Sequence, residues 1–390
     1  MKKLQEEISE ELYGRILPFW LGPMRSPDGE WYGSMDCACR PMKDAPRGCI
    51  LNARILWTFS SAFRLSGRQE YLQAASSARD YILSHFIDRE YGGAFWSVNP
   101  DGTPHQTKKQ FYAIAFVIYA LAEYSRATGE SPDEAVALFR CIEAHSADRN
   151  LGGYFEALSR EWSPLEDVRL SARDRDDVKT MNTHLHILEA YTALCRVWPD
   201  TEMKDALRRI IGIFMERIVR PDGHLALFFT ENWQSTCDML SYGHDIEASW
   251  LLCEAAAVLG DDALSARVCA VSMRIASASL EGLGEGMIYE RDPSTGHLDE
   301  DRHWWVQAET VLGCLNQYEL TGEEQWRTRA LGVWEFIKKY LRHPAGEWYW
   351  SAKPLDTGGF VPNTSDDLAG FWKCPYHNGR MCMEIIEKLK

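Results

Sequence analysis

The feature that most constrains the fold is a turn that recurs six times along the chain. In each copy a glycine is closely followed by a short, mostly aromatic, strand-like run, and successive glycines lie about 60 to 70 residues apart. The six copies are SPDGEWYG (Gly29), EYGGAFW (Gly93), NLGGYFE (Gly153), RPDGHLALFF (Gly223), LGEGMIYE (Gly286) and PAGEWYW (Gly346). A period of this length predicts a repeat architecture in which each copy marks one structural unit.

Between these turns the sequence predicts pairs of helices. Apolar residues recur at i, i+3, i+4 and i+7, for example over 50–67 and 71–86, and several first helices end at a capping glycine. Six turns, about twelve helices and no low-complexity linker predict an all-α fold. We expect a single domain over residues 1–390, an (α/α)6 barrel of six helical hairpins with short β-like loops at one rim. An open solenoid is the alternative, but the first and last units carry the same turn and neither resembles a polar cap.

The composition of the chain argues against some classes of binding partner. The formal net charge of −15 argues against a nucleic-acid partner, because phosphate backbones require clustered Lys and Arg. No stretch approaches the roughly 18 uninterrupted apolar residues of a membrane span, and the N-terminal segment reads as an amphipathic helix rather than a signal peptide. The 11 cysteines are odd in number and scattered. We therefore expect a soluble, cytoplasmic, monomeric protein with reduced thiols and no membrane or nucleic-acid partner.

Unusual polar and aromatic residues concentrate near the starts of alternate predicted helices. In an α-hairpin barrel these helices line a cavity, where a polar side chain is costly unless it is hydrogen-bonded or functional. Because equivalent ends of alternate helices meet at one rim, we predict a pocket there. Its residues are Arg54 and Trp57; Tyr112; Asn182 and His186; His244 and Glu247; Trp304, Trp305 and Glu309; and Trp372 with His377.

Helical geometry refines this set. Residues three or four apart share a helix face, whereas residues two apart point nearly opposite ways. His186 is therefore predicted to face the cavity with Asn182, and His184 to lie behind it. Glu247, one turn after His244, is expected to orient the His244 ring. A lone helical histidine or tryptophan is usually structural, but the co-location of three histidines, one arginine and two glutamates favours a functional site, and aromatic faces pack well on pyranose rings.

Five segments carry a resemblance to a known family. They are RGCILNARILW, KTMNTHLHILEAY, SYGHDIEASWL, RHWWVQAE and WKCPYHNGRMCMEI. In this order, over nearly the whole chain, they resemble the N-acylglucosamine 2-epimerase superfamily and, within it, the cellobiose 2-epimerases. The stretch KKQFYAIAF around Tyr112 departs from the family's usual pattern at Ala113 and Ile114, and the loop 160–178 has no counterpart in it.

The resemblance implies a cofactor-free, metal-free enzyme. It would invert carbon 2 of the reducing-end glucose in β-1,4-linked disaccharides such as cellobiose, lactose and mannobiose. By motif it implies that His244 and His377 transfer protons, that His186 is a third essential histidine, and that Arg54 and Tyr112 lie near the reacting oxygens. The other implied substrate-binding or supporting residues are Asn182, Glu247, Trp304, Trp305, Glu309 and Trp372.

Inversion at carbon 2 needs groups of these types. The open-chain aldehyde makes the carbon 2 hydrogen acidic, and its removal leaves a cis-enediolate, which Arg54 can stabilise. Imidazoles serve as both base and acid near neutral pH. Other classes stay open: an aldose–ketose isomerase, an N-acylglucosamine 2-epimerase, an inverting glycoside hydrolase built on Glu247 and Glu309, and a non-catalytic sugar-binding module.

Overall fold

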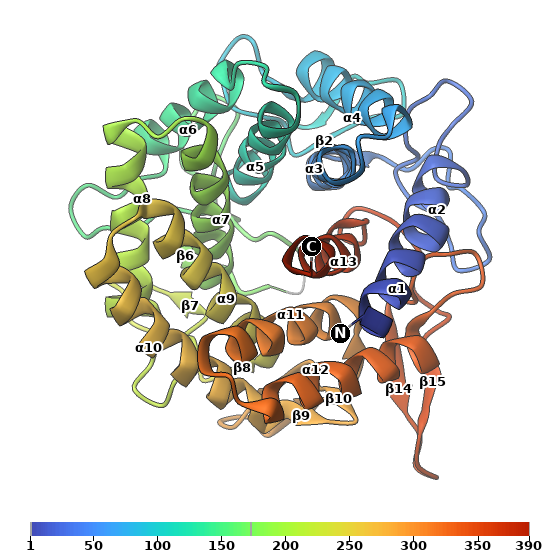
Figure 1. Cartoon of the computed structure of the whole chain (residues 1–390). Coiled ribbons are helices and arrows are strands. Elements are labelled where there is room, and N and C mark those ends of the chain that lie inside the picture. Colours follow the sequence, from blue (N-terminus) through green and yellow to red (C-terminus); the bar gives the residue numbers. More distant parts are fainter. Residues whose placement is uncertain (1, 172–173, 390) are drawn as a thin grey trace.

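The helices form two concentric rings in the computed structural model, which describes residues 2–171 and 174–389 (Figure 1). The inner ring consists of α3 (Cys49–Ser66), α5 (Phe111–Thr128), α7 (Met181–Val197), α9 (Tyr242–Leu259), α11 (Trp304–Thr321) and α13 (Tyr376–Lys388). The outer ring consists of α4 (Gln69–Tyr81), α6 (Asp133–His145), α8 (Thr201–Ile213), α10 (Asp262–Ser279), α12 (Glu324–Phe336) and the N-terminal pair α1 (Lys2–Glu10) and α2 (Leu17–Leu21). The predicted all-α barrel is confirmed.

The two rings differ in how their helices are buried. Helix α5 buries every residue from Phe111 to Ser125, as expected for a helix enclosed on all sides. Helix α8 buries one stripe, Met203, Ala206, Leu207, Ile210 and Ile211, which faces the inner ring. Four inner helices end at a glycine in the left-handed region with φ between 69° and 79°, namely Gly67, Gly129, Gly260 and Gly322. The helix boundaries predicted from glycine caps are thus confirmed for these helices.

Short π-helical turns follow several outer helices, namely η1 (Glu11–Ile16), η2 (Ile82–Phe86), η3 (Phe214–Ile218) and η5 (Ile337–Leu341), and a 3-10 turn, η4 (Leu280–Gly282), follows α10.

The recurring glycines are turn residues, as the sequence predicts. All six repeat glycines have positive φ, between 71° and 115°. At Gly153 an added Cβ would come within 2.3 Å of the Trp233 ring and 2.8 Å of His184 Nε2, so only glycine fits there.

Short antiparallel strands bring the starts of the inner helices to one rim. The strand just before each of α3, α5, α7, α9 and α11 pairs with a strand that follows the next turn. The pairs are β1 (Arg47–Gly48) with β2 (Ser97–Val98), β4 (Lys109–Gln110) with β5 (Ala157–Leu158), β6 (Lys179–Thr180) with β7 (Phe228–Phe229), β8 (Leu240–Ser241) with β11 (Glu290–Asp292), and β13 (Arg302–His303) with β14 (Ser351–Pro354). The remaining strands are β3 (Pro104–Gln106), β9 (Leu283–Gly284), β10 (Gly286–Met287), β12 (His297–Asp299) and β15 (Phe360–Pro362). These are the β-like loops predicted at one rim.

The two ends of the chain together make the sixth hairpin, which closes the ring. Helix α13 packs between α3 and α11, while α1 and η1 cover it from outside (Figure 1). Trp348 Nε1 donates to Glu11 Oε1 at 2.6 Å, and Trp20 Nε1 donates to Glu347 Oε2 at 2.6 Å. The Lys373 ammonium lies 3.1 Å from Glu347 Oε1, and both side chains are fully buried. These bonds join the N-terminal helices to the last turn, so the barrel is closed and is not an open solenoid.

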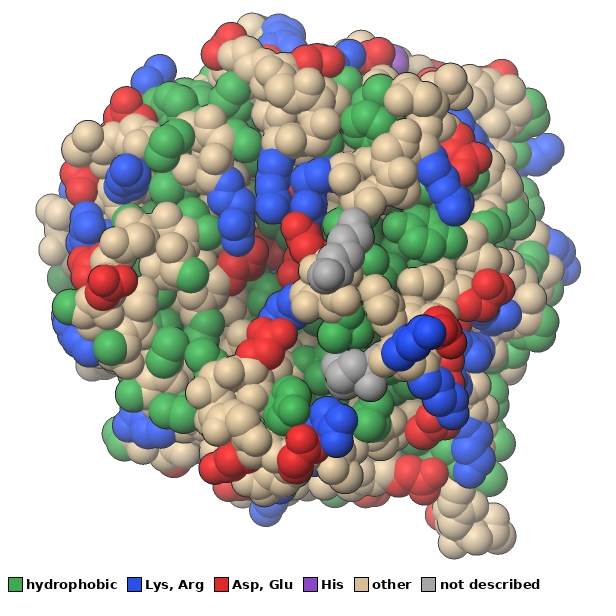
Figure 2. Space-filling model, in the orientation of Figure 1, with side chains coloured by type: hydrophobic (Ala, Val, Ile, Leu, Met, Phe, Trp, Pro, Cys, Tyr) green, Lys and Arg blue, Asp and Glu red, His purple; other side chains and the backbone are tan. Residues whose placement is uncertain are grey.

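Ion pairs occupy the end of the barrel where the inner helices finish. Figure 2 shows acidic and basic side chains gathered around the centre of this face, on which the C-terminus lies. Arg64 pairs with Glu123 at 2.7 Å and with Glu387 at 2.8 Å, and Arg196 pairs with Glu254 at 2.7 Å. The predicted pocket lies at the other rim, where the inner helices begin.

Helix α10, together with η4, is long and apolar enough to cross a membrane by length and composition alone. An 18-residue window within Asp262–Gly282 has a mean hydropathy of 1.2. In the barrel this helix packs along α9 and buries Val268, Ser272, Ile275 and Ala276 against the inner ring. Its apolar residues are therefore those of an outer barrel helix, and because Arg267 and Arg274 interrupt them, the prediction that no stretch of uninterrupted apolar residues reaches membrane-span length holds.

We predict that Glu347 is a main contributor to ring closure. Glu347→Ala would leave the buried Lys373 ammonium and the Trp20 indole N–H without their acceptor, and should lower the free energy of unfolding by about 3–5 kcal/mol. Urea denaturation at neutral pH measures this. Glu335→Ala, at an exposed helix position, is the control and should change it by less than about 0.5 kcal/mol. A loss below about 1 kcal/mol for Glu347→Ala would contradict the assignment.

Candidate active site

One half of the predicted pocket is organised around Arg54 of α3. Its Nη2 donates to the Tyr112 hydroxyl at 3.1 Å, and its Nη1 donates to the Trp372 carbonyl oxygen at 3.2 Å. The Tyr112 ring lies 4.8 Å from the His186 ring and 6.0 Å from the Trp372 ring. Residues from four distant parts of the sequence therefore meet here, as predicted from their positions at the helix starts.

The other half of the pocket is built around Trp305 of α11. Its ring lies 4.8 Å from the His244 ring and 5.6 Å from the His377 ring, so both histidines border one indole. Trp305 is 8% exposed and Trp372 is half-buried. The three histidines, from α7, α9 and α13, thus lie close together where the pocket is predicted, with two aromatic faces that suit a sugar ring.

Arg54 is a buried cation without a carboxylate partner. Among the described residues it forms no ion pair, and its Nε has no hydrogen-bond partner. Burial acts to lower the pKa of Arg54, but the neighbouring Tyr112, Cys374 and Tyr376 raise it above its ordinary value. The guanidinium therefore stays charged, and its charge is available to an anionic group in the pocket.

His186 is oriented by a carboxylate that the sequence analysis did not single out. His186 Nδ1 lies 3.0 Å from Glu189 Oε2, and Glu189 also accepts hydrogen bonds from Tyr376 and Arg380. Burial acts to raise the pKa of Glu189, but the Arg380 charge and these hydrogen bonds lower it to about 2. An ionised carboxylate can only accept, so His186 Nδ1 must donate. Its Nε2 is then left as the basic nitrogen.

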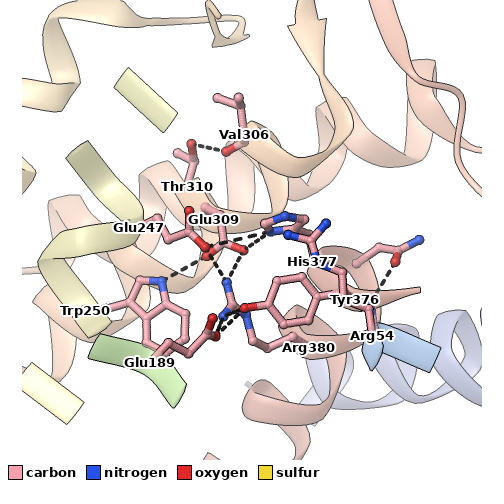
Figure 3. Close-up of polar contacts among 12 residues, drawn as sticks. Arg54, Glu189, Glu247, Trp250, Val306, Glu309, Thr310, Tyr376, His377 and Arg380 are labelled. Atoms are coloured by element: carbon pink, nitrogen blue, oxygen red, sulfur yellow. Dashed lines mark hydrogen bonds and ion pairs between the residues drawn. The ribbon is translucent and has the colours of Figure 1, made fainter. Parts of the chain in front are cut away.

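His377 has the same arrangement with a different carboxylate. Its Nδ1 lies 2.7 Å from Glu309 Oε1, which also accepts from Arg380 Nη2 at 2.7 Å, while Glu309 Oε2 accepts from Trp250 Nε1 at 3.0 Å (Figure 3). Burial, together with the Arg54 and Arg380 charges, lowers the pKa of His377 well below its ordinary value. His377 is therefore neutral at pH 7, with Nε2 as its free base.

His244 is held differently, and one prediction about it is wrong. Its Nδ1 lies 2.7 Å from the Ser241 hydroxyl, and burial, together with nearby His186, lowers its pKa to about 3. Glu247 does not orient the His244 ring, because Glu247 Oε1 instead accepts from Arg380 Nη2 at 2.7 Å. The buried guanidinium on α13 draws the carboxylate across the lumen. Since a hydroxyl can donate or accept, His244 is free to exchange which nitrogen carries its proton.

Two of the charged groups that link these histidines, Arg380 and Glu189, were missed by sequence reasoning, whereas Glu247 and Glu309 were predicted. Figure 3 shows Arg380 at the centre, joined to Glu189, Glu247 and Glu309 from α7, α9 and α11. A signal was present, because Glu189 follows His186 by three residues and Arg380 follows His377 by three. The same spacing rule that paired His244 with Glu247 places each of them on the face of its histidine.

The remaining predicted residues lie at the margin of the pocket. His184 faces away from it, as expected: its Nδ1 lies 2.6 Å from the Thr180 carbonyl oxygen and its Nε2 accepts from the Tyr154 N–H at 2.9 Å. Asn182 is half-buried, and its Oδ1 has no hydrogen-bond partner among the described residues. The Trp304 ring packs on Trp350 at 4.7 Å and lies 6.4 Å from the His377 ring.

Comparison with known proteins identifies the family. The sequence profile of N-acylglucosamine 2-epimerase (GlcNAc 2-epimerase) matches residues 31–364. A cellobiose 2-epimerase of Bacteroides fragilis is 51% identical over 390 residues, covering 98% of each chain. The solved structure of a cellobiose 2-epimerase from Bacillus thermoamylovorans B4167 is 37% identical, covers 100% of both chains and has a TM-score of 0.93. The chain belongs to the N-acylglucosamine 2-epimerase family.

Membership of the epimerase family confirms the predicted class of enzyme, a sugar epimerase. A D-mannose isomerase of Marinomonas mediterranea is a more distant relative, 21% identical over 88% of this chain and 87% of its own. Epimerases and isomerases thus both occur among relatives of this chain.

One group of pocket residues has the composition of a metal site. Ligand atoms of Glu247, Glu309 and His377 all lie within 4.8 Å of one another. Arg380 Nη2, however, donates to both carboxylates at 2.7 Å and supplies the positive charge there. A metal ion would have to displace this guanidinium and the His377 Nδ1 proton, so the three residues do not form a ready divalent-cation site in this epimerase.

We predict that His186 and His184 differ sharply in their effect on turnover. His186→Asn should lower kcat by at least about two orders of magnitude, because it removes an acid–base group from the pocket. His184→Asn should keep most turnover but lower the free energy of unfolding by about 1–3 kcal/mol, because the buried Tyr154 N–H loses its acceptor. Steady-state kinetics and urea denaturation of both folded variants make the comparison. Loss of turnover in His184→Asn with retention in His186→Asn would show the helical phase to be wrong.

Proposed function

We propose that the protein inverts carbon 2 of the reducing-end glucose of β-1,4-linked disaccharides. Cellobiose would give 4-O-β-D-glucopyranosyl-D-mannose, lactose would give epilactose, and β-1,4-mannobiose would react in the reverse sense. The observation that carries the proposal is the convergence of three neutral histidines with one unpaired buried cation, Arg54. The full-length similarity to cellobiose 2-epimerases supports the choice of disaccharides.

The pocket contains the groups that each step of this reaction needs. Opening of the pyranose ring requires proton transfer between the anomeric hydroxyl and the ring oxygen, which a neutral imidazole can mediate. A second imidazole then removes the carbon 2 proton, leaving a cis-enediolate whose negative oxygen is stabilised by the Arg54 guanidinium. A third imidazole returns a proton to the opposite face. His186, His244 and His377 are assigned to these three steps as a set.

Burial keeps the histidines in the neutral form that can accept a proton, although a lowered pKa also makes each imidazole a weaker base. A neutral imidazole with a lowered pKa does not need to lose a proton before it can accept one, and the pKa of His244 is lowered to about 3. Glu189 and Glu309 stabilise the imidazolium that forms on His186 or His377, since each accepts the Nδ1 hydrogen bond. The Trp305 and Trp372 rings provide apolar faces for the two sugar units.

The competing reactions fit the pocket less well. An inverting hydrolase needs two carboxyl groups on opposite sides of the scissile bond, roughly 6.5–9.5 Å apart. Glu247 Oε1 and Glu309 Oε1 instead accept hydrogen bonds from the same nitrogen, Arg380 Nη2.

A sugar-binding module would not require three histidines. An aldose–ketose isomerase, which returns the proton to carbon 1, uses the same groups and differs only in product. An N-acylglucosamine 2-epimerase is disfavoured by the disaccharide activity of the cellobiose 2-epimerase relatives.

We further propose that the enzyme acts in the cytoplasm as a monomer without a metal or redox cofactor. The acidic composition, with a net charge of −15, is suited to solubility and does not suit nucleic acid. Arg380 and Arg54 supply positive charge at the positions where a metal ion would otherwise be needed.

We predict solvent exchange at carbon 2 during turnover. Protein incubated with cellobiose in D2O containing EDTA should release 4-O-β-D-glucopyranosyl-D-mannose with deuterium at carbon 2, because imidazole protons exchange with solvent. NMR of the sugar resolves the epimer from a ketose and reports the label. A ketose as main product would support the isomerase, and loss of activity in EDTA with recovery on adding a divalent metal would contradict the cofactor-free mechanism.

A further inference from the structure

The arrangement around Arg380 has a consequence for Glu247. We propose that Glu247 is held as a neutral carboxylic acid, and that its Oε2 donates a hydrogen bond to the oxyanion of the sugar intermediate. The second part rests on the proposed function, whereas the first concerns the free protein. Glu247 would then act as a neutral hydrogen-bond donor and not as a carboxylate that supports a histidine.

The hydrogen bonds show which carboxyl groups must be ionised. Glu309 accepts three: from Arg380 and His377 at Oε1, and from Trp250 at Oε2. Glu189 accepts from Arg380 and Tyr376 at Oε1 and faces His186 at Oε2. Both oxygens of each group accept hydrogen bonds, which favours the ionised form; burial raises the pKa of Glu309, and Arg380 and Trp250 oppose this shift.

Glu247 differs from these two carboxyl groups. Its Oε1 accepts from Arg380 Nη2 and lies 4.0 Å from His377 Nδ1, which already donates to Glu309. Within residues 2–171 and 174–389 the hydrogen bond of the Glu247 side chain is at Oε1, so Oε2 is not engaged, and the side chain keeps 1% of its surface exposed whereas that of Glu309 keeps none. Oε2 is thus the one carboxyl oxygen of the three groups that is free to carry a hydrogen.

Charge balance favours one proton in this cluster. Three carboxyl groups, those of Glu189, Glu247 and Glu309, meet one guanidinium, that of Arg380. One guanidinium does not neutralise three buried carboxylates, so a proton on the carboxyl group that has a free oxygen lowers the cost of burying the cluster while the histidines are neutral. Burial first, and then the negative charge of Glu309, raise the pKa of Glu247 well above its usual range.

The groups that act on Glu247 come from every inner helix around it. Arg380 favours its ionised form, while Glu309 and Glu189 disfavour it. His377 and His186 are neutral at pH 7 and, with Tyr112, add no net charge. The carboxylates that oppose ionisation bind the same guanidinium as Glu247, so their negative charges act on it at short range. The proton therefore stays on Glu247 near neutral pH.

A neutral carboxyl at this position has a clear chemical use. Negative charge that develops on the sugar oxygen during carbon 2 deprotonation is best stabilised by fixed donors in a water-poor site. A carboxylic acid kept neutral at pH 7 supplies such a donor, as in ketosteroid isomerase. The proton remains on Glu247 throughout, so the step transfers no proton beyond those handled by the histidines. Arg54 and Glu247 would then bracket the oxyanion as two donors.

Matched amide substitutions test the donor role. Glu247→Gln keeps a neutral side chain with an acceptor for Arg380 and a donor for the sugar, and should keep kcat/KM on cellobiose within about tenfold of wild type. Glu247→Ala should lose about 10²–10³-fold, as expected for loss of one oxyanion donor. Glu309→Gln is the matched control on the same Arg380 nitrogen and should also lose at least about 10²-fold, because His377 loses its anionic acceptor.

The pH profile of the same variants gives a second readout. Because Glu247 acts only when protonated, wild-type kcat/KM should fall as the pH rises through the raised pKa of Glu247. Glu247→Gln should lack this alkaline fall. Equal losses in Glu247→Gln and Glu309→Gln, or an unchanged alkaline fall in Glu247→Gln, would overturn the donor role.

Infrared spectroscopy tests the protonation state independently of activity. The difference spectrum of wild type minus Glu247→Gln at pH 7 should contain the C=O band of a neutral carboxylic acid. A carboxylate signal in place of the acid band for Glu247 would overturn the proposal. If wild type epimerised no disaccharide, the proposed function would fail while the infrared result still decided the state of Glu247.

Discussion

The pocket depends on one buried guanidinium. Arg380 of α13 is fully enclosed, packs over the Trp250 and Tyr376 rings, and bonds to carboxyl groups on α7, α9 and α11. Removing such a charge from water is expensive, and only several well-placed acceptors make it tolerable. The helix that closes the barrel is therefore tied to three inner helices at the level of the pocket, so ring closure and assembly of the site are one event.

This arrangement also sets the chemistry of the histidines. Arg380 keeps Glu189 and Glu309 ionised, and each carboxylate fixes the Nδ1 proton of one histidine, which leaves Nε2 of His186 and His377 as bases. His244, on the Ser241 hydroxyl, is not constrained in this way. Pre-set proton positions reduce the reorganisation needed during reaction. The three histidines thus look alike in the sequence but differ in how tightly their protons are placed.

Much of the fold follows from local sequence. The six glycine turns predict the repeat, the glycine caps predict helix ends, and helical phase predicts that His186 rather than His184 faces the pocket. The pairing of both chain ends into the sixth hairpin was not predicted, because bonds such as Trp20 to Glu347 join residues more than 300 positions apart. The prediction that Glu247 orients the His244 ring was wrong for a similar reason. The spacing of three residues along one helix favours that contact, but Arg380, which lies 133 residues away in the sequence, binds the Glu247 carboxyl group instead.

The central claim is that carboxylates anchored by Arg380 fix the tautomers of two histidines, and ¹⁵N NMR of the imidazoles tests it most directly. Spectra of wild type at pH 7, assigned with His186→Asn and His377→Asn, report which ring nitrogens are protonated. The account predicts that both histidines are neutral with the proton on Nδ1. A proton on Nε2 of either neutral ring, or a doubly protonated ring at this pH, would contradict it.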